Sequence, residues 1–180
     1  MKPTPHTIIT TTILAAALAL AFAGCASVSP FGVSSKPVAQ NIKITLDKTL
    51  ENTSLQVDLI GASTMADLPK WQSYSVTDYW QPGNTTRRDT DRVTLDFGPG
   101  KPATQALSAA DSKWKQWLAT GAANLVIIAD LPGVSADKGG PADPRRLIIP
   151  IDAKSWKKAA KDPIEILVQE SGLRLLTPRN

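Results

Sequence analysis

Cys25 is the first residue whose chemistry stands out, because its thiol is the only one in the 180-residue chain. It directly follows the small residues Ala23-Gly24, and an apolar run from Ile8 to Phe22 precedes them. Lys2 puts positive charge before that run, which is shorter than the ~20 residues that a membrane-spanning helix needs. This order of a positive start, an apolar stretch and small residues is typical of a secretory signal peptide. We therefore predict that residues 1–24 are a signal peptide and are removed.

The stretch Ala23-Gly24-Cys25 resembles the bacterial lipobox, in which the cysteine is diacylated and becomes the new N-terminus. Phe22 departs from the pattern, since leucine is usual there. The resemblance implies lipidation of Cys25, and two or three acyl chains are enough for stable anchoring. Ala26 is not the aspartate that retains lipoproteins at the inner membrane, which implies the periplasmic side of the outer membrane. The alternative is ordinary secretion, because Ala21-Phe22-Ala23 also fits an A-x-A cleavage pattern.

Histidine is nearly absent from the chain. The single one, His6, lies in the predicted signal peptide, and Cys25 is assigned to lipid. The mature chain then lacks the residues for a Ser-His-Asp or Cys-His catalytic group and for the usual zinc site. Asp130, Asp137 and Asp143 could gather a calcium ion, but their spacing matches no EF-hand and no bidentate glutamate follows them. We predict that the protein is no enzyme and binds no metal or other cofactor.

A long loop rich in glycine, proline and aspartate is the best candidate for protein binding. It runs for 16 residues from Leu131 to Arg146, whereas a hairpin connection usually needs two to five. Loops of this length are often functional, and the two arginines at its exit offer donors suited to carboxylates. We predict that an envelope protein partner contacts Leu131, Val134, Asp137, Asp143, Arg145 and Arg146.

Four aromatic residues form the alternative site: Trp71, Tyr74, Tyr79 and Trp80. They could stack on a sugar or anchor a partner, which would make the chain an envelope ligand- or glycan-binding protein. The competing interpretation is that they fill one end of the core, since buried Trp and Tyr are common. The local structure is equally open: Ser75 could cap a short helix over 76–80, or residues 71–74 could begin an edge strand.

Alternating apolar residues predict most of the strands. They occur in 42–46, 55–59 and 93–97, and the first two are expected to form an antiparallel hairpin. The continuous apolar run Asn124 to Ala129 predicts a buried central strand. Further strands are expected at 147–149, 164–168 and 173–176. Pro150 should end the first of these three, and a two-residue turn at Ser171-Gly172 should join the last two.

One convincing helix is predicted from Leu107 to Gly121, with Ser108 as its N-cap and Gly121 as its C-cap. Its apolar stripe would consist of Trp114, Trp117 and Leu118. Residues 85–91 read as a polar loop, and residues 153–161 as a short helical turn.

These elements predict a mainly β fold, an antiparallel β-sandwich with one or two short helices. We assign residues 25–40 to a flexible tether, because they are rich in serine, proline and small residues, and residues 41–178 to the sandwich domain. The chain has 20 Lys and Arg against 16 Asp and Glu, and the basic residues lie in doublets. Without a continuous basic stripe, no nucleic-acid partner is expected.

The order of elements resembles the outer-membrane lipoprotein of the type VI secretion membrane complex. The comparable features are Cys25, the strand 55–60, the central strand 125–129, the strand 146–149 and the closing hairpin 164–176. The resemblance implies a transthyretin-like β-sandwich with added helices, held in the periplasm. It also implies that the sandwich binds another envelope protein as an anchor of a secretion complex. The sequence Ala129 to Gly133 departs from the family, whose central strand usually runs into an aromatic-and-arginine turn.

Overall fold

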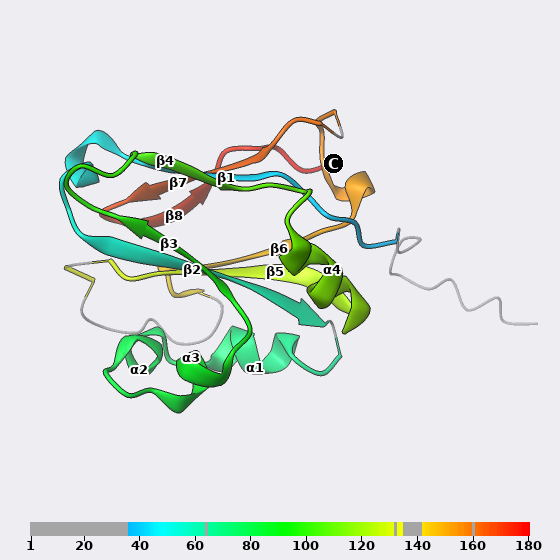
Figure 1. The fold of residues 1–180 in the computed structure, drawn as a ribbon, viewed down its shortest axis with the longest axis horizontal. Helices are drawn as coiled ribbons and strands as arrows, with labels where there is room; N and C mark the ends of the chain where they lie inside the picture. Colours follow the sequence, from blue (N-terminus) through cyan, green and yellow to red (C-terminus); the bar gives the residue numbers. More distant parts are fainter. Residues whose placement is uncertain (1–35, 64, 132, 135–141, 160) are drawn as a thin grey trace, which may run out of the picture. The chain divides into compact units, whose positions relative to one another are not determined.

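The computed structural model describes residues 36–63, 65–131, 133–134, 142–159 and 161–180, and Figure 1 shows their fold. These residues form two four-stranded sheets, with strand orders β4-β1-β7-β8 and β3-β2-β5-β6. The strands are β1 Ile42–Leu46, β2 Leu55–Ser63, β3 Val93–Phe97, β4 Thr104–Leu107, β5 Ala122–Ala129, β6 Arg146–Pro150, β7 Ile164–Gln169 and β8 Gly172–Leu175. The helices are α1 Leu68–Ser73, α2 Val76–Trp80, α3 Thr85–Asp89 and α4 Ser112–Ala119, with 3-10 turns at Lys48–Leu50 and Ala153–Ser155.

The predicted β-sandwich is confirmed, with one parallel strand pair and more helices than expected. Strands β1 and β7 pair in parallel, from Ile42 with Ile164 to Leu46 with Val168, while the other pairs are antiparallel. The main core fills the space between the sheets, and alternate residues of every strand point into it. Its fully buried members include Ile42, Ile44, Leu59, Leu125, Ile127, Ile149, Ile164 and Ile166.

The predicted hairpin between 42–46 and 55–59 is wrong, because β1 and β2 lie in different sheets. The 3-10 turn Lys48–Leu50 separates them, and the Asp47 side chain caps it by accepting from the Thr49 N–H at 3.2 Å. Alternation fixes which face of a strand is buried and says nothing about its neighbour. Both strands therefore keep the expected apolar face while pairing with other strands.

A second core lies on the outer face of the β3-β2-β5-β6 sheet, where α1, α2 and α3 cover it (Figure 1). It contains Ile60, Val126 and Ile128 from the sheet, so β2 and β5 are apolar on both faces. Ser75 caps α2, since its Oγ accepts from the Asp78 N–H at 3.0 Å; the helical alternative for 76–80 is correct. Residues 71–74 belong to α1 and its end, not to an edge strand.

The polar loop predicted at 85–91 begins with helix α3. The Asn84 side chain caps this helix by accepting from the Arg87 N–H at 2.8 Å. The helix has no buried residue, so it lacks the apolar stripe by which a helix is recognised in a sequence.

The helix predicted from Leu107 is shorter and starts later. Leu107 ends strand β4 and pairs with Ile42, and the N-cap of α4 is Asp111 rather than Ser108. The Asp111 Oδ1 accepts from the Lys113 N–H at 2.8 Å. The predicted apolar positions are correct, since Trp114 and Trp117 are buried in the main core. Gly121 follows α4 with a φ of 85°, as expected for a residue that ends a helix.

Smaller corrections concern the C-terminal half and the tether. Pro150 pairs with Asn124 and so belongs to β6, and residues 170–171, between the paired Gln169 and Gly172, form the β7–β8 turn. Among the described residues after β6, helical structure is limited to Ala153–Ser155. At the end of the predicted tether, the Val38 N–H donates to the Ile151 carbonyl at 3.1 Å. The tether thus joins the domain before residue 41.

Candidate interaction surface

The loop between β5 and β6 is described at its two ends. Leu131 is buried in the main core, and Val134 packs against that core. Residues 135–141, which include Asp137, lie outside the described residues. At the far end, Asp143, Arg145 and Arg146 are all buried. The base of the loop is therefore part of the folded domain.

The buried charges at the loop base bind one another. Arg145 forms a bidentate ion pair with Asp143, with Nη2–Oδ2 at 2.7 Å and Nε–Oδ1 at 3.1 Å. Its Nη1 also donates to the Val134 carbonyl at 3.2 Å, which fastens the two ends of the loop together. We predicted that these arginines donate hydrogen bonds to a partner. Arg145, however, is only 5 % exposed, and its guanidinium donates to groups of the same chain. Burial needs such pairing, because an unpaired buried charge is costly.

The aromatic stretch forms a packed cluster in the second core. Tyr79 lies at its centre, with ring centroids 5.9 Å from Trp71, 6.5 Å from Tyr74 and 5.3 Å from Trp80. Trp71 and Tyr79 are buried, and Tyr74 and Trp80 are half-buried. A stacking platform needs exposed ring faces, so the structure favours the core interpretation of these residues.

The two stretches that the sequence offers as alternative sites are neighbours in the structure. Arg145 Nη2 donates to the Thr77 hydroxyl at 3.2 Å, and Arg146 Nη1 donates to the Tyr74 carbonyl at 2.6 Å. The arginines therefore connect the loop base to α2 and to the residue before its cap. These two arginines therefore link the loop base to the aromatic cluster.

A buried carboxylate, Asp58, organises the same helical layer and was not predicted. It is fully buried on β2 and accepts from the Tyr79 hydroxyl at 2.8 Å, Arg87 Nε at 2.8 Å and the Thr94 hydroxyl at 2.6 Å. Arg92 Nε lies 3.2 Å from the same carboxylate. The only signal in the sequence is a charged residue inside an apolar strand.

The charges and hydrogen bonds around Asp58 keep Arg87 positively charged and the Tyr79 hydroxyl protonated. Burial, followed by the Asp58 charge, raises the pKa of the Tyr79 hydroxyl far above its ordinary value. Burial opposes the charge of Arg87, but its hydrogen bond and ion pair with Asp58 outweigh this and raise the pKa of Arg87. The Arg87 guanidinium also lies 4.2 Å from the Trp80 ring centroid, within the range of a cation–π contact. Asp58 therefore holds α2, α3 and β3 against β2.

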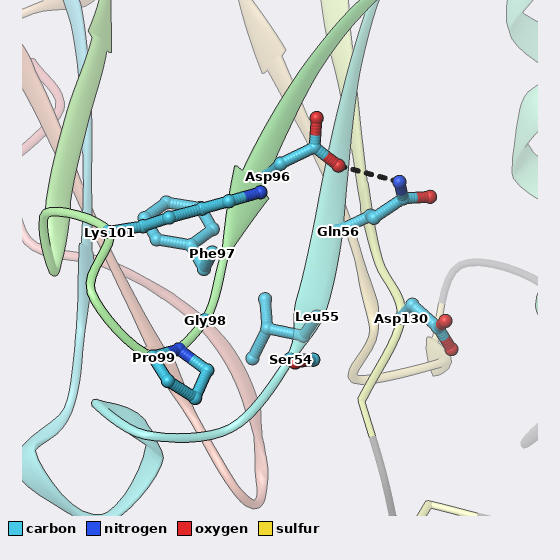
Figure 2. A pocket seen from close by; sticks show the side chains of 9 residues that line it. All are labelled: Ser54, Leu55, Gln56, Asp96, Phe97, Gly98, Pro99, Lys101 and Asp130. Atoms are coloured by element: carbon cyan, nitrogen blue, oxygen red, sulfur yellow. Dashed lines mark hydrogen bonds between the residues drawn. The ribbon is translucent and has the colours of Figure 1, made fainter.

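A pocket of about 300 Å³ opens beside the start of the loop, and Figure 2 shows the side chains that line it. The Gln56 amide donates to the Asp96 carboxylate at 2.6 Å between the neighbouring strands β2 and β3, and the Asp130 N–H donates to the Gln56 carbonyl at 2.9 Å. Partial burial raises the pKa of the Asp130 carboxyl. Both polar and apolar side chains line the pocket. Its lining consists of Ser54, Leu55, Gln56, Asp96, Phe97, Gly98, Pro99, Lys101 and Asp130.

The described residues contain no group of three or more His, Cys, Asp and Glu residues that could hold a metal ion. No helix in the described part is long and apolar enough to cross a membrane. Cys25 and the predicted signal peptide lie outside the described residues, so lipidation stays a prediction.

Comparison with known proteins gives matches in structure alone. No family description and no curated protein sequence matches the chain. A chain of the structure described as "T6SS protein TssM C-terminal domain (869-1107) from EAEC" has a TM-score of 0.50 at 12% identity, covering 76% of this chain and 99% of that one. A chain from a "Type VI membrane complex" has a TM-score of 0.48 at 13% identity, covering 76% and 96%.

The third structure is Serratia marcescens Lip, "a membrane bound component of the Type VI Secretion System", with a TM-score of 0.46 at 10% identity, covering 76% of this chain and 95% of that one. At such identities the similarity concerns the fold, which is best supported by the match at a TM-score of 0.50. The predicted resemblance to type VI secretion membrane-complex proteins is confirmed at that level: this chain is similar to them in fold.

Proposed function

We propose that this protein is a lipid-anchored envelope protein whose β-sandwich binds another envelope protein, as an anchor within a secretion complex. The observation that carries the proposal is the shared fold with a chain of the EAEC type VI secretion structure at a TM-score of 0.50. A fold alone does not define a function, so two features of this chain must support it. They are the lipobox-like sequence and the fastened loop base.

The first feature supplies the anchor. Cys25 directly follows Ala23-Gly24, and acylation there would tether the domain to a membrane by two or three chains. With Ala26 after the cysteine, the proposed location is the outer membrane, facing the periplasm. Residues 26–35 would link the anchor to the first described residues.

The second feature supplies the contact surface. Arg145 binds both Asp143 and the Val134 carbonyl, so the described residues on either side of 135–141 are held together, and Asp130, just before the loop, lines the pocket of Figure 2. A fixed base lowers the conformational entropy that a loop loses on binding. We assign the role to non-catalytic binding of a protein, with no nucleic-acid partner. The aromatic alternative has less support, because Trp71 and Tyr79 are 4% and 0% exposed.

The anchor is tested with Cys25→Ser in the full chain. Radiolabelled palmitate should enter the unchanged protein and not the variant, and the variant should leave the outer-membrane fraction. Palmitate labelling that persists in the variant would refute the assignment of the lipid to Cys25.

Partner binding is tested by replacing residues 135–141 with a Gly-Ser turn, which leaves Val134 and its bond to Arg145 in place. The variant should no longer capture an envelope protein in a pull-down from envelope extracts of the same organism, while its melting temperature stays nearly unchanged. Lys154→Ser is the matched control, because Lys154 is exposed beyond the opposite end of β6. Equal binding by all three proteins would exclude the loop as the contact.

A further inference from the structure

The two sheets present four edge strands, β3, β4, β6 and β8. An edge strand exposes unpaired N–H and C=O groups that another strand can use. On β6, Pro150 has no N–H, the Arg146 N–H donates to the Asp143 carbonyl at 3.1 Å, and Arg179 donates to the Ile148 carbonyl at 3.2 Å. This edge is therefore closed to a further strand.

Two other edges are also occupied. On β8, the Leu173 N–H donates to the Pro144 carbonyl at 2.8 Å, so the end of the β5–β6 loop covers it. On β3, the Gln105 side chain donates to the Asp96 carbonyl at 2.7 Å. Both contacts use groups that an added strand would need.

The edge of β4 differs. The Leu46 N–H donates to the Ala103 carbonyl at 2.8 Å, so residues 103, 105 and 107 face β1. The N–H and C=O groups of Thr104 and Ala106 then point away from the sheet, and both residues are exposed. Within the described part of the chain, these outward groups make no hydrogen bond. No charged residue or proline protects the strand, whose sequence is Thr-Gln-Ala-Leu.

The surroundings of β4 indicate what kind of segment fits. A pocket of about 350 Å³ opens beside the strand, with apolar walls from Ile42, Ala106, Leu107 and Pro163. Exposed lysines lie near both ends of the strand: Lys101 comes three residues before it and lines the pocket of Figure 2, and Lys161 lines the pocket beside β4. Lys43, also in the lining, is neutralised by Glu165 at 2.8 Å.

We propose that β4 accepts an extended, acidic segment of a protein partner as an added strand. Thr104 and Ala106 provide the hydrogen bonds, an apolar side chain of the segment enters the pocket, and carboxylates lie opposite Lys101 and Lys161. A second copy of this chain is a poorer occupant, because antiparallel β4–β4 pairing would bring the lysines of both copies together. The inference rests on the proposed function and adds the partner's local structure and charge.

The probe is an acetylated heptapeptide of alternating valine and threonine with glutamate at both ends, and its matched control carries lysine at both ends. Titrated into the full chain in detergent, the acidic peptide should bind at least about tenfold more tightly. It should also slow hydrogen exchange at the Thr104 and Ala106 amides. No protection by the acidic peptide, or equal binding of both peptides, would overturn the proposal. Protection that grows with protein concentration alone would assign the edge to self-pairing and would also overturn it.

Two variants make the test specific. Ala106→Pro removes one outward N–H without touching the bonds to β1, and should weaken acidic-peptide binding about tenfold; Ala106→Ser keeps the N–H and should bind as the unchanged chain does. If the proline variant fails to fold, Lys161→Glu serves instead and should reduce the preference for the acidic peptide. Since the probe is a peptide, failure here leaves lipidation and loop-dependent capture of an envelope protein as separate results.

Discussion

Replacing Gly61 with alanine tests how α4 packs on the sheet. Gly61 lies on the core face of β2, and a Cβ there would lie 2.4 Å from Trp117 Cγ, 2.6 Å from its Cβ and 2.7 Å from its Cδ2. Ordinary carbon contacts are about 3.5–4.0 Å, so the indole or the strand must move by about 1 Å. Trp117 is 2% exposed and belongs to the main core, so a shift of its indole would disturb the packing of its neighbours.

The expected cost of Gly61→Ala is about 3 kcal/mol, the upper part of the usual range for an overfilled core. Urea denaturation of the full chain, followed by tryptophan fluorescence and far-ultraviolet circular dichroism, gives this difference if the m-value stays constant. Trp117→Ala alone should cost about 3–5 kcal/mol through the lost indole. Alanine at 117 removes the Cγ and Cδ2 atoms and keeps only the Cβ, so Gly61→Ala should cost about 1–2 kcal/mol there.

Gly83→Ala is the matched control. Gly83 has open space around its Cβ position but a φ of +77°, so alanine should cost about 1 kcal/mol through backbone strain, with or without Trp117. If Gly61→Ala costs the same on both backgrounds, overlap with the indole is not its cause, and the proposed packing of α4 is refuted.

Three further predictions concern the cores and the pocket. Asp58→Ala should cost about 3–5 kcal/mol of unfolding free energy in urea denaturation, because the donors that bind this buried carboxylate lose their acceptor. Thr94→Val should cost about 1 kcal/mol, and equal costs would contradict the central role of Asp58. Ile127→Ala should cost about 2–5 kcal/mol, and a loss below about 1 kcal/mol would mean that β5 is not central. Because the pKa of Asp130 is raised in the folded protein, its ionisation opposes folding as pH rises above the unfolded value near ~3.9. Asp130→Asn should therefore raise the melting temperature at pH 7 but not below about pH 3, and the same gain from the exposed Glu51→Gln would point to a general charge effect.

The sequence determined the local features of this protein. Alternation located the strands at 42–46, 55–59 and 93–97, and the continuous apolar run located the buried centre of β5. Burial on one face imposes a period of two on a strand, whatever its neighbours are. The predicted signal peptide and the predicted lipidation of Cys25 likewise depend on residue order alone.

Tertiary structure decided what depends on residues far apart in the chain. It placed β1 beside β7 rather than β2, because a strand's alternation is the same in either pairing. It turned Arg145 inward to Asp143 and Thr77, and it gathered Tyr79, Arg87 and Thr94 around Asp58. The sequence does not show whether a charged side chain is solvated by water or paired with a buried partner. Only the packing of α1, α2 and α3 on the sheet removed the water and made those partners necessary.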